Sequence, residues 1–406
     1  MKPLLKKSLV NKEFKVQNFR SNSFFPDDVR WMRAAIAASR QAVGRSGVNP
    51  PVGCVLISAD GRLLSVGHTG KGGVPHAERA ALQSLRGADR SALQGGTAYV
   101  TLEPCIHHGK TPPCSNALIG AGIKRLVVAL EDPDPRMNGG GLDQIAAANI
   151  EVISGVLQLE YEEIVSGFIN KIKHGKPLCS IKIAASIDGK IALSDRKKRW
   201  ITGLPMRRYV HFLRSQVDAI VTGIGTVLAD NPEFNCRNAG LQYDSPPIYV
   251  LDRLLRTPPK AKLFQSLQTV TLFCGNTVPD KHKAKFSNFG ATVVVLPDDS
   301  TGKLDVCAAL KYMGSQGLNH VLIEAGTEIV TAFINADLVD QIYWTQSNHI
   351  LGADTLAAVG AINPKQINKV AIMPETKYTQ SFHRVIGSDR LTVLKKVLIN
   401  SGKTQA

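Results

Sequence analysis

The feature that most constrains this chain is a run from His76 to Cys114 that holds one imidazole and two thiols in a fixed order. Pro75-His76-Ala77-Glu78 stands at the head of a helical pattern, and a buried strand pattern ends at Pro104-Cys105. Cys114 follows an eight-residue insert and begins a second helical pattern. Three nitrogen and sulfur ligands with a fourth position left open are typical of catalytic zinc, whereas structural zinc takes four protein ligands. The run therefore predicts a catalytic zinc site.

Glu78 lies two residues from His76, too close to be needed as a ligand, and its carboxylate is placed to carry protons. His-x-Glu followed by Pro-Cys and a second Cys resembles the pattern of zinc-dependent nucleobase deaminases, which activate water for attack on a ring carbon. A closed structural site is the alternative, with His107 or His108 as its fourth ligand. The insert, Ile106 to Pro113, favours the open site because its imidazole, ammonium and hydroxyl donors suit a polar, phosphorylated substrate.

The length of 406 residues exceeds one ordinary domain, so we expect two. Hydrophobic residues at 44% and charged residues at 20% are typical of a globular protein with enough apolar material for two cores. No stretch approaches the run of about eighteen apolar residues that a membrane span needs. The seven cysteines are scattered and odd in number, which disfavours a disulfide framework and predicts a reducing, cytoplasmic environment.

The formal net charge of +16 is compatible with nucleic acid, anionic lipid or phosphorylated metabolites as partners. Part of this charge is local, because residues 1–26 contain six basic residues and one acid. We expect this segment to be a disordered basic tail. Its shortage of acids is also a feature of transit peptides, which is the alternative.

Strand and helix patterns alternate after the tail. Apolar strand patterns occur at 52–57, 63–68, 97–102, 123–130 and 150–153, with helical patterns between most of them. This alternation predicts a three-layer α/β/α domain over residues 27–174. The boundary is placed near residue 174, where a basic stretch, Lys171 to Lys176, interrupts the apolar pattern.

A second α/β domain is expected over residues 175–406. A buried strand, Ala219 to Thr222, runs into Gly223-Ile224-Gly225-Thr226, where glycines let backbone amides approach a phosphate. Gly-x-Gly alone is weak evidence, because many strand ends look alike. A later strand, His320 to Ile323, ends in Glu324-Ala325-Gly326-Thr327. Open α/β sheets bind ligands at the carboxyl ends of their strands, so both segments are candidate ligand sites.

Three motifs give the chain a resemblance to a known family. They are Asn49-Pro50-x-Val52-Gly53, His76-Ala77-Glu78, and Thr101-Leu102-Glu103-Pro104-Cys105-x-His107-x-Gly109-Lys110-Thr111-Pro112-Pro113-Cys114. The sequence resembles the bifunctional deaminase–reductases of riboflavin biosynthesis. The eight-residue insert distinguishes this family from cytidine and transfer-RNA deaminases, whose cysteines are two residues apart. The resemblance covers about residues 27 to 395.

For the first domain the resemblance implies a cytidine-deaminase-like fold in which His76, Cys105 and Cys114 hold Zn²⁺ and Glu78 is the catalytic proton carrier. The implied reaction removes the amine from 2,5-diamino-6-ribosylamino-4(3H)-pyrimidinone 5′-phosphate. The side chains implied to face this substrate are those of Asn49, His68, His107, Lys110 and Thr111.

For the second domain the decisive stretch is Thr226 to Arg237, which resembles the reductase half of the family and implies a dihydrofolate-reductase-like fold. The implied cofactor is NADPH, which would reduce the ribosyl group of the deaminated product to ribityl. Cofactor contacts are implied for Ala184, Trp200, Thr226, Asp230 and the Gly326 to Ala332 segment, which includes Thr327. Substrate contacts are implied for Lys198, Arg214, Phe234, Arg237 and Glu324, with Arg237 or its neighbours on the phosphate, because the guanidinium fork binds phosphate oxygens in pairs.

The second domain departs from the family pattern in three places. Lys198 stands in a basic run, Asp195 to Arg199, where the family usually has Gly-Glu-Ser or similar. Glu328 places an acid beside the expected cofactor phosphates, and Gln346 to Gly352 replaces a more apolar Pro-x-Leu-Leu-Gly form. These departures leave open a deaminase whose reductase half is inactive.

A basic RNA-binding or RNA-editing deaminase is a further alternative, because of the positive charge. Against it stand the whole second domain and the aromatic content of only 6%, since single-strand binders stack bases on aromatic side chains. We therefore expect a small phosphorylated pyrimidine as the partner, a homo-oligomer, and neither a nucleic-acid nor a membrane partner.

Overall fold

The computed structural model describes residues 17–18, 26–107, 112–195, 199–362 and 378–397. The chain divides into two compact units, Met1–Val165 and Ser166–Ala406. The division falls inside helix α6 (Gln158–His174), and the predicted boundary near residue 174 lies at the end of that helix. The basic stretch used to place that boundary begins inside the helix: Lys171, Lys173 and His174 occupy its last turn, where positive charge is favourable.

The first unit contains a six-stranded mixed sheet with the strand order β1-β6-β5-β4-β2-β3. Strands β4, β5 and β6 run parallel, whereas β2 is antiparallel to both of its neighbours. The strands are β1 (Gln17–Asn18), β2 (Gly53–Ile57), β3 (Leu63–His68), β4 (Thr97–Leu102), β5 (Arg125–Leu130) and β6 (Glu151–Ser154).

Strand β1 lies within the segment that the sequence analysis expected to be a disordered tail. Gln17 and Asn18 pair in parallel with Ile153 and Ser154 of β6, so the expectation is wrong for these two residues. The edge of β6 offers backbone hydrogen-bonding groups that a passing extended segment can use whatever its composition. The rest of residues 1–25 lies outside the described residues.

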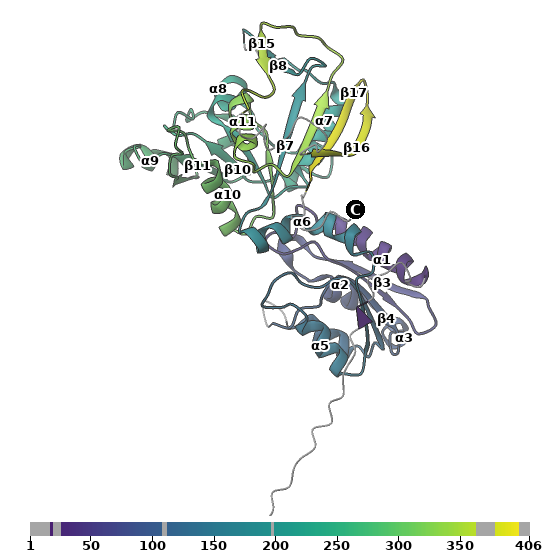
Figure 1. The fold of residues 1–406 in the computed structure, drawn as a ribbon. Helices are drawn as coiled ribbons and strands as arrows, with labels where there is room; N and C mark the ends of the chain where they lie inside the picture. Colours follow the sequence, from purple (N-terminus) through teal and green to yellow (C-terminus); the bar gives the residue numbers. More distant parts are fainter. Residues whose placement is uncertain (1–16, 19–25, 108–111, 196–198, 363–377, 398–406) are drawn as a thin grey trace, which may run out of the picture. The chain divides into compact units, whose positions relative to one another are not determined.

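Helices cover both faces of this sheet, as the α/β/α prediction required (Figure 1). Helices α2 (Ala77–Ser84), α4 (Cys114–Gly120) and α5 (Gly140–Ala147) pack on one face around Leu56, Val100 and Val128. Helix α1 (Pro26–Ser39) lies on the other face, where Asp28 accepts a hydrogen bond from Tyr99 Oη at 2.9 Å. A short helix, α3 (Ala88–Ala92), and the 3₁₀ turns η1 (Arg40–Ala42) and η2 (Lys71–Gly73) complete the unit.

The second unit is built on a nine-stranded sheet with the order β12-β11-β10-β9-β13-β7-β14-β17-β16. The strands from β12 to β14 run parallel, and an antiparallel hairpin completes the sheet. The strands are β7 (Leu178–Ala185), β9 (Ala219–Gly223), β10 (Ile248–Leu251), β11 (Val270–Cys274), β12 (Ala291–Val295), β13 (His320–Ile323), β14 (Gln341–Gln346), β16 (Tyr378–Ile386) and β17 (Asp389–Lys396). Strands β8 (Lys190–Leu193) and β15 (Thr355–Ala357) form a separate two-stranded sheet.

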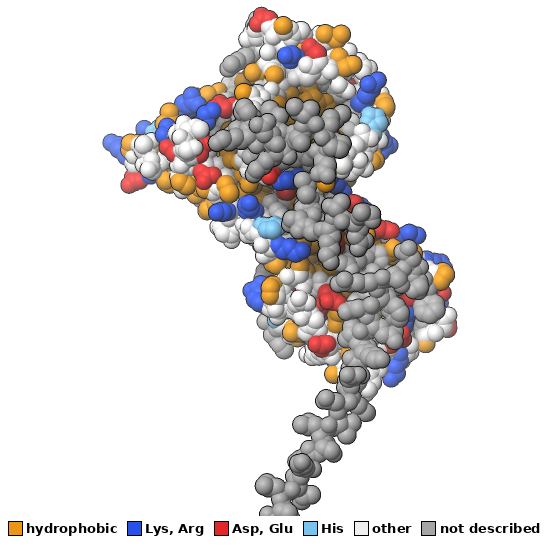
Figure 2. Space-filling view, viewed as in Figure 1, with side chains coloured by type: hydrophobic (Ala, Val, Ile, Leu, Met, Phe, Trp, Pro, Cys, Tyr) orange, Lys and Arg blue, Asp and Glu red, His pale blue; other side chains and the backbone are white. Residues whose placement is uncertain are grey.

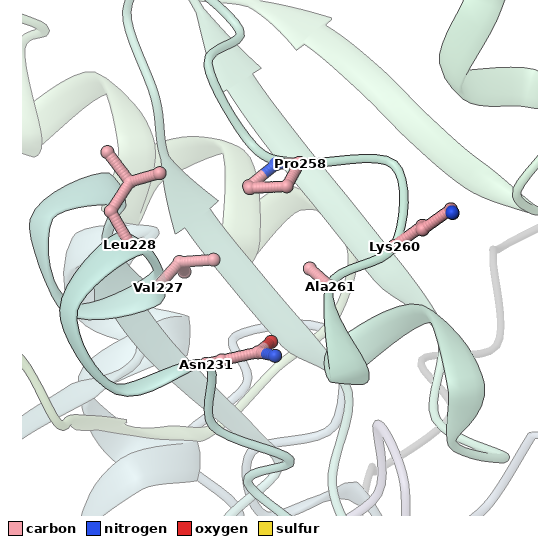
Figure 3. A pocket seen from close by; sticks show the side chains of 6 residues that line it. All are labelled: Val227, Leu228, Asn231, Pro258, Lys260 and Ala261. Atoms are coloured by element: carbon pink, nitrogen blue, oxygen red, sulfur yellow. The ribbon is translucent and has the colours of Figure 1, made fainter.

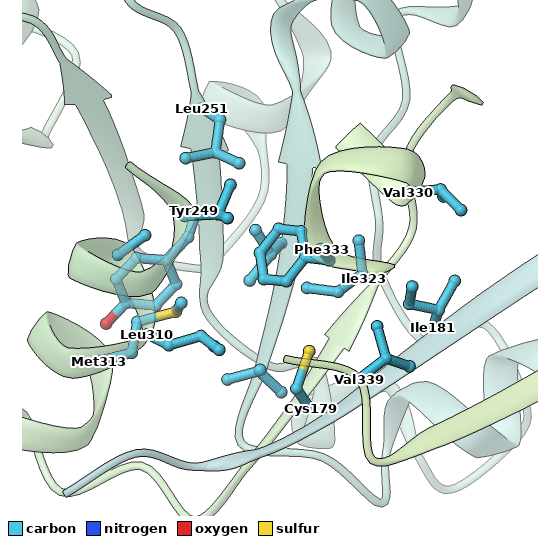
Figure 4. Packing of buried hydrophobic residues seen from close by; sticks show 14 of the residues in the cluster. Cys179, Ile181, Tyr249, Leu251, Leu310, Met313, Ile323, Val330, Phe333 and Val339 are labelled. Carbon is cyan, nitrogen blue, oxygen red and sulfur yellow. The ribbon is translucent and has the colours of Figure 1, made fainter. Parts of the chain in front are cut away.

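Two layers of helices enclose the nine-stranded sheet. Helices α10 (Val306–Ser315) and α11 (Thr327–Asn335) pack on one face, where Phe333 lies among Tyr249, Ile323 and Leu310 (Figure 4). Helices α7 (Leu204–Arg214), α8 (Ile224–Asp230) and α9 (Asp280–Ser287) cover the other face. The 3₁₀ turns are η3 (Gln242–Asp244) and η4 (Lys262–Gln265).

Buried strands that read as continuous apolar runs become parallel strands covered on both faces, as expected of α/β proteins. Their carboxyl ends lead into the polar segments that the sequence analysis selected. None of the helices in the described parts of the chain has the length and apolar character needed to cross a membrane.

Candidate active sites

His76, Cys105 and Cys114 come together in the first unit, and their ligand atoms all lie within 4.8 Å of one another. His76 is the residue before α2, Cys105 follows β4, and Cys114 is the first residue of α4. The Nδ1 atom of His76 lies 3.6 Å from Cys105 Sγ and 3.4 Å from Cys114 Sγ. A tetrahedral zinc ion with Zn–S of about 2.3 Å and Zn–N of about 2.0–2.1 Å requires N–S separations of about 3.6 Å. The three side chains therefore fit zinc in both donor chemistry and spacing.

The metal-binding group has three members among the described residues, which agrees with the open, catalytic form rather than the closed one. Of the two residues considered as a fourth ligand, His107 directs Nδ1 towards Met137 Sδ at 3.3 Å, and His108 lies outside the described residues. The hydrogen bond between the two thiols lowers the pKa of Cys105 and raises the pKa of Cys114, so Cys105 is the thiol that loses its proton first. The backbone N–H of Cys114 also donates to Cys105 Sγ at 3.4 Å.

Glu78 lies in the first turn of α2 and is almost completely buried, with 3% of its surface exposed. Burial raises the pKa of its carboxyl group to about 7. A group with a pKa near the working pH can both accept and release a proton, which is what a general acid–base needs. The structure thus places the predicted proton carrier in the first turn after the histidine ligand.

Of the other side chains predicted to meet the first substrate, three lie in described segments. Asn49 donates from Nδ2 to the carbonyl oxygen of Gly73 at 3.1 Å, and His68 Nδ1 lies 3.0 Å from the carbonyl oxygen of Thr69. His107 contacts Met137, as described above. Lys110 and Thr111 lie outside the described residues. The substrate roles of all five stay predictions.

Two residues that organise this site were not selected from the sequence. The buried carboxylate of Glu103 accepts hydrogen bonds from the backbone N–H groups of Asp132, Gly139 and Gly141 at 3.0, 3.0 and 2.7 Å. It thereby ties the strand that leads to Cys105 to the loop before α5. Arg79 donates from Nε and Nη2 to the carbonyl oxygen of Pro112 at 3.2 and 3.0 Å, which fixes the end of the insert. Their partners are backbone atoms, which leave no mark in a sequence.

In the second unit, three predicted substrate residues meet at a buried ion pair. Arg214 of α7 binds Glu324, which follows β13, through Nε–Oε1 and Nη2–Oε2 contacts of 2.6 and 2.9 Å. The two side chains are only 12% and 8% exposed. The Arg214 guanidinium also lies 5.5 Å from the ring centroid of Phe234.

Lys182 of β7 belongs to the same charged group and was missed by the sequence analysis. Burial lowers the pKa of its ammonium group, and the charge of Glu324 acts in the opposite direction. In the sequence Lys182 reads as one polar position of an alternating strand, so nothing distinguishes it from a solvent-facing lysine.

The predicted cofactor residues lie on the carboxyl-end side of the parallel strands. Thr226 and Asp230 belong to α8, which begins directly after β9, and Gly326 precedes α11, which follows the neighbouring strand β13. A Cβ atom added at Gly223 would meet the Ile329 side chain at 2.7 Å, so α8 and α11 begin close together. A Cβ atom added at Gly225 or Gly326 would meet nothing within 4 Å. The space beside the backbone is therefore open at the starts of both helices. Backbone N–H groups at a helix start can bind phosphate, so this arrangement fits the phosphates of a dinucleotide.

The other predicted cofactor residues have the following contacts. Thr327 donates from its hydroxyl group to the carbonyl oxygen of Ala357. Ala184 lies on β7 opposite Thr345 of β14. Trp200 is exposed, and the guanidinium of Arg207 lies 4.2 Å from its ring centroid. Arg207 of α7 therefore covers the Trp200 ring.

Comparisons with known proteins match the two units separately and together. The family described as the cytidine and deoxycytidylate deaminase zinc-binding region matches residues 26–130, and the RibD C-terminal domain family matches residues 177–391. The riboflavin biosynthesis protein RibD of Escherichia coli is 33% identical over 374 residues, which cover 89% of this chain and 97% of that protein. The protein of the same name from Synechocystis is 36% identical over 326 residues, covering 80% and 85%.

This chain belongs to the RibD family of riboflavin biosynthesis proteins. A solved structure of Acinetobacter baumannii RibD superposes with a TM-score of 0.80 at 30% identity, covering 92% of this chain and 99% of that one. The Thermotoga maritima diaminohydroxyphosphoribosylaminopyrimidine deaminase/5-amino-6-(5-phosphoribosylamino)uracil reductase superposes with a TM-score of 0.78 at 30% identity, covering 91% and 99%. As a RibD family member the chain is a zinc deaminase fused to an NADPH-dependent reductase, and its substrate is a small pyrimidine. The sequence-based expectations of family, fold, enzyme class and cofactors are confirmed.

Two of the three departures from the RibD pattern fall in described segments. Glu328 is paired with Lys303, whose Nζ atom lies 2.6 Å from Glu328 Oε1, so its charge is compensated at the protein surface. In the segment that replaces the apolar form, the backbone N–H of Gly352 donates to Asp188 at 2.8 Å. That hydrogen bond, together with two weaker ones from Leu351, fixes the segment to the turn before β8. Lys198 lies outside the described residues.

A cavity of 260 Å³ opens beside α8 in this RibD family member (Figure 3). It is lined by Val227, Leu228, Asn231, Pro258, Lys260 and Ala261. Val227 and Leu228 belong to α8 and Asn231 follows its end, so the cavity lies away from the glycine-bearing start of this helix. None of the six residues was predicted to contact cofactor or substrate. We therefore assign the cavity to neither reaction.

Proposed function

We propose that the first unit hydrolyses 2,5-diamino-6-ribosylamino-4(3H)-pyrimidinone 5′-phosphate with release of ammonia, and that the second unit uses NADPH to reduce the ribosyl group of the product to ribityl. One observation carries the proposal: the same chain contains two groups of site residues. The first is the His76–Cys105–Cys114 cluster with buried Glu78 beside it. The second is the Arg214–Glu324 ion pair with Phe234 beside it. The name of the Thermotoga protein, which contains both activities, supports the proposal.

In the deamination, His76, Cys105 and Cys114 would hold the metal. Zinc supplies Lewis acidity that makes water a nucleophile near neutral pH. Glu78 would carry the two protons of the attacking water in turn, one to the ring nitrogen beside the attacked carbon and one to the departing amine nitrogen, so that a C–N bond breaks, a C=O bond forms and ammonia leaves. The burial of Glu78 suits this cycle, because it raises the pKa of the carboxyl group to about 7, near the working pH.

In the reduction, the starts of α8 and α11 would hold NADPH, with Ala184, Trp200, Thr226, Asp230, Gly326 and Thr327 as its contacts. NADPH would supply a hydride to the ribosyl carbon, whose bond to the ring oxygen breaks while that oxygen takes up a proton from water. Arg214 and Glu324 fix each other in a buried, charge-neutral pair, which gives the substrate a rigid polar surface. Phe234 lies beside this pair, and Arg237 binds the 5′-phosphate from an exposed position. Lys198 is kept as a further substrate contact.

The test follows ammonia and NADPH in one reaction mixture with the full chain and the diaminopyrimidine substrate. We expect ammonia release to precede NADPH oxidation, and a chelator to stop both. With substrate that has already been deaminated, NADPH oxidation should continue in the presence of the chelator. Ammonia release without any NADPH oxidation would replace the proposal with a deaminase whose reductase half is inactive.

The described residues on the face seen in Figure 2 give no specific support to the RNA-editing alternative. On the face seen in Figure 2, described Lys and Arg side chains are interspersed with acidic and apolar ones rather than gathered in one patch. An RNA-binding protein should lose affinity steeply with salt. Absence of RNA binding at low salt would remove this alternative.

We further propose a homo-oligomeric, cytoplasmic protein with a deaminase domain over 27–174 and a reductase domain over 175–406. Strand β16 supports an oligomer, because it is the outer strand of the nine-stranded sheet and exposes its side chains from Thr379 to Val385. Seven free cysteines support a reducing compartment. Light scattering of the purified chain, cell fractionation, and separate expression of the two segments test these points in turn.

A further inference from the structure

The inference concerns one face of α7, where His211 and Arg214 are three residues apart and therefore neighbours. Both side chains reach the carbonyl oxygen of Asn235: His211 through Nδ1 at 2.9 Å and Arg214 through Nη1 at 3.1 Å. This carbonyl belongs to the segment between Phe234 and Arg237, which carries predicted substrate contacts at both ends. Helix α7 therefore holds the position of that segment directly.

The two hydrogen bonds of His211 define which of its nitrogens carries the proton. A carbonyl oxygen can only accept, so Nδ1 bears the hydrogen that it donates to Asn235. The other nitrogen, Nε2, lies 3.2 Å from Nε of Arg237. An arginine Nε always carries a hydrogen, so Arg237 donates and His211 Nε2 accepts. His211 is thus a neutral imidazole that joins the Asn235 backbone to the Arg237 guanidinium.

We propose that His211 is a positioning residue for the reductase reaction, which holds Arg237 by its Nε edge so that the two terminal Nη groups face the 5′-phosphate of the substrate. The inference rests on the proposed function, in which Arg237 binds this phosphate. An arginine held at Nε presents its remaining N–H donors in one plane, which matches two phosphate oxygens. Without this contact, the exposed guanidinium has to give up more side-chain freedom when it binds.

The charged groups around His211 favour its neutral form. Burial lowers its pKa first, and the nearby positive charges of Arg214 and Arg237 lower it further. The hydrogen bond to Asn235 and the negative charge of Glu324 act in the opposite direction without reversing the shift. Protonation in acid would place a hydrogen on Nε2, opposite the Nε–H of Arg237, and would break the contact. The Michaelis constant for the phosphorylated substrate should therefore rise as pH falls.

Two substitutions in the full chain test the role of His211. His211→Leu removes both hydrogen bonds, whereas His211→Gln keeps an acceptor at the reach of Nε2 and cannot be protonated. The substrates are 5-amino-6-(5-phosphoribosylamino)uracil and the same compound without its phosphate. We expect His211→Leu to raise KM for the phosphorylated substrate about tenfold, the factor that corresponds to one charge-assisted hydrogen bond, while kcat and the KM of the dephosphorylated compound change little. His211→Gln should restore most of the KM and remove part of its rise at low pH.

Two controls accompany these variants. Ammonia release, measured on the same preparation, shows that the first unit of each variant is folded and loaded with metal, and an unchanged kcat for the reduction shows that the second unit is folded. Arg208→Leu changes an exposed side chain on the same helix and should leave KM unaltered.

Three results would overturn the inference. They are an unchanged KM in His211→Leu, an equal rise for both substrates, or a low-pH rise in His211→Gln identical to that of the unsubstituted protein. The phosphate of the substrate also titrates, but its effect on KM is the same for all variants and cancels when their pH dependences are compared. Arg237→Gln separates the two levels of the argument. If it leaves the ratio of the two KM values unchanged, the proposed phosphate site is wrong. If it changes the ratio and His211→Leu does not, only the role of His211 is wrong.

Discussion

The two candidate sites are assembled over very different distances along the chain. In the deaminase unit, His76 is separated from its two cysteine partners by 29 and 38 positions, and all three residues lie at the ends of elements that follow one another. In the reductase unit, Arg214 and Glu324 are 110 positions apart, and the pairing of β9 with β13 in the sheet brings them together. A local site can be recognised as a motif, whereas a site assembled by the sheet has to be seen in three dimensions.

The largest expected effect tests whether the local site works through a single carboxylate. Glu78→Gln should reduce ammonia release by about 10³-fold, because the amide cannot carry the proton between water and the leaving nitrogen. Zinc content and the reduction of deaminated substrate should stay unchanged, since the ligands and the second unit are untouched. Ammonia assays and metal analysis measure these quantities. Deamination at the unaltered rate would show that another group carries the proton.

The next effect concerns the stability of the long-range site. Glu324→Gln leaves the buried Arg214 guanidinium without its counter-charge and should cost about 3 kcal/mol of reductase-unit stability. Denaturant unfolding of the full chain measures this loss. The double variant Arg214→Met, Glu324→Gln is the matched control and should lose less than the two single changes combined. A loss below about 1 kcal/mol would mean that the pair is solvated and contributes little.

A pH-dependent effect on stability is expected at His320 of the reductase unit. Burial of His320 lowers its pKa to about 4, and its ordinary value is about 6.5. Between these values the unfolded chain binds the proton more readily than the folded chain, so His320 contributes stability above pH 6.5 that is lost as pH falls towards 4.

Unfolding measurements of the unsubstituted protein and of His320→Gln at pH 7 and pH 5 isolate this contribution. The loss of stability between the two pH values should be smaller in the variant by about 2 kcal/mol. Asp218, whose pKa is raised to about 6 by burial, acts with the opposite sign but is present in both proteins. Equal losses would show that His320 is not desolvated in the folded chain.

A smaller effect tests whether backbone contacts support the local site. Glu103→Gln replaces one carboxylate oxygen by an N–H₂ group, which cannot accept a hydrogen bond from a backbone N–H. The loss should cost about 1–2 kcal/mol of deaminase-unit stability. Zinc content should persist while KM for the diaminopyrimidine rises. Glu131→Gln, at a carboxylate with one hydrogen bond to Ser154, is the control and should have the weaker effect. If both changes were equally mild, Glu103 would not organise the loop.

The smallest effect is expected at the surface of the long-range site. The Lys303–Glu328 pair is exposed, and exposed pairs contribute little. Glu328→Gln should therefore alter KM for NADPH by less than about twofold. Cofactor titration of the reductase reaction measures it. A tenfold fall in KM would show instead that Glu328 opposes NADPH binding and that this departure from the family pattern weakens the second reaction.

Periodicity and motif spacing predicted most of the elements, because apolar strands and amphipathic helices are encoded by neighbouring residues. An error occurs where distant backbone decides the outcome. Residues 17–18 pair with β6 although nothing in their composition indicates a strand. The structure also shows two contacts that residue types do not indicate: Glu103 binds three backbone N–H groups, and Arg79 binds a backbone carbonyl.

The sequence by itself identified the family and predicted the metal ligands and the proton carrier, because these residues lie in one run whose order and spacing are rare. Only the tertiary structure decided that Arg214 and Glu324 neutralise each other, that the charge of Lys182 acts on Glu324, and that His211 joins Asn235 to Arg237. The physical reason is that these contacts depend on how β7, β9 and β13 are ordered in the sheet, and on which face α7 packs. Strand order and helix placement follow from the packing of the whole core, so no single stretch of the sequence contains them.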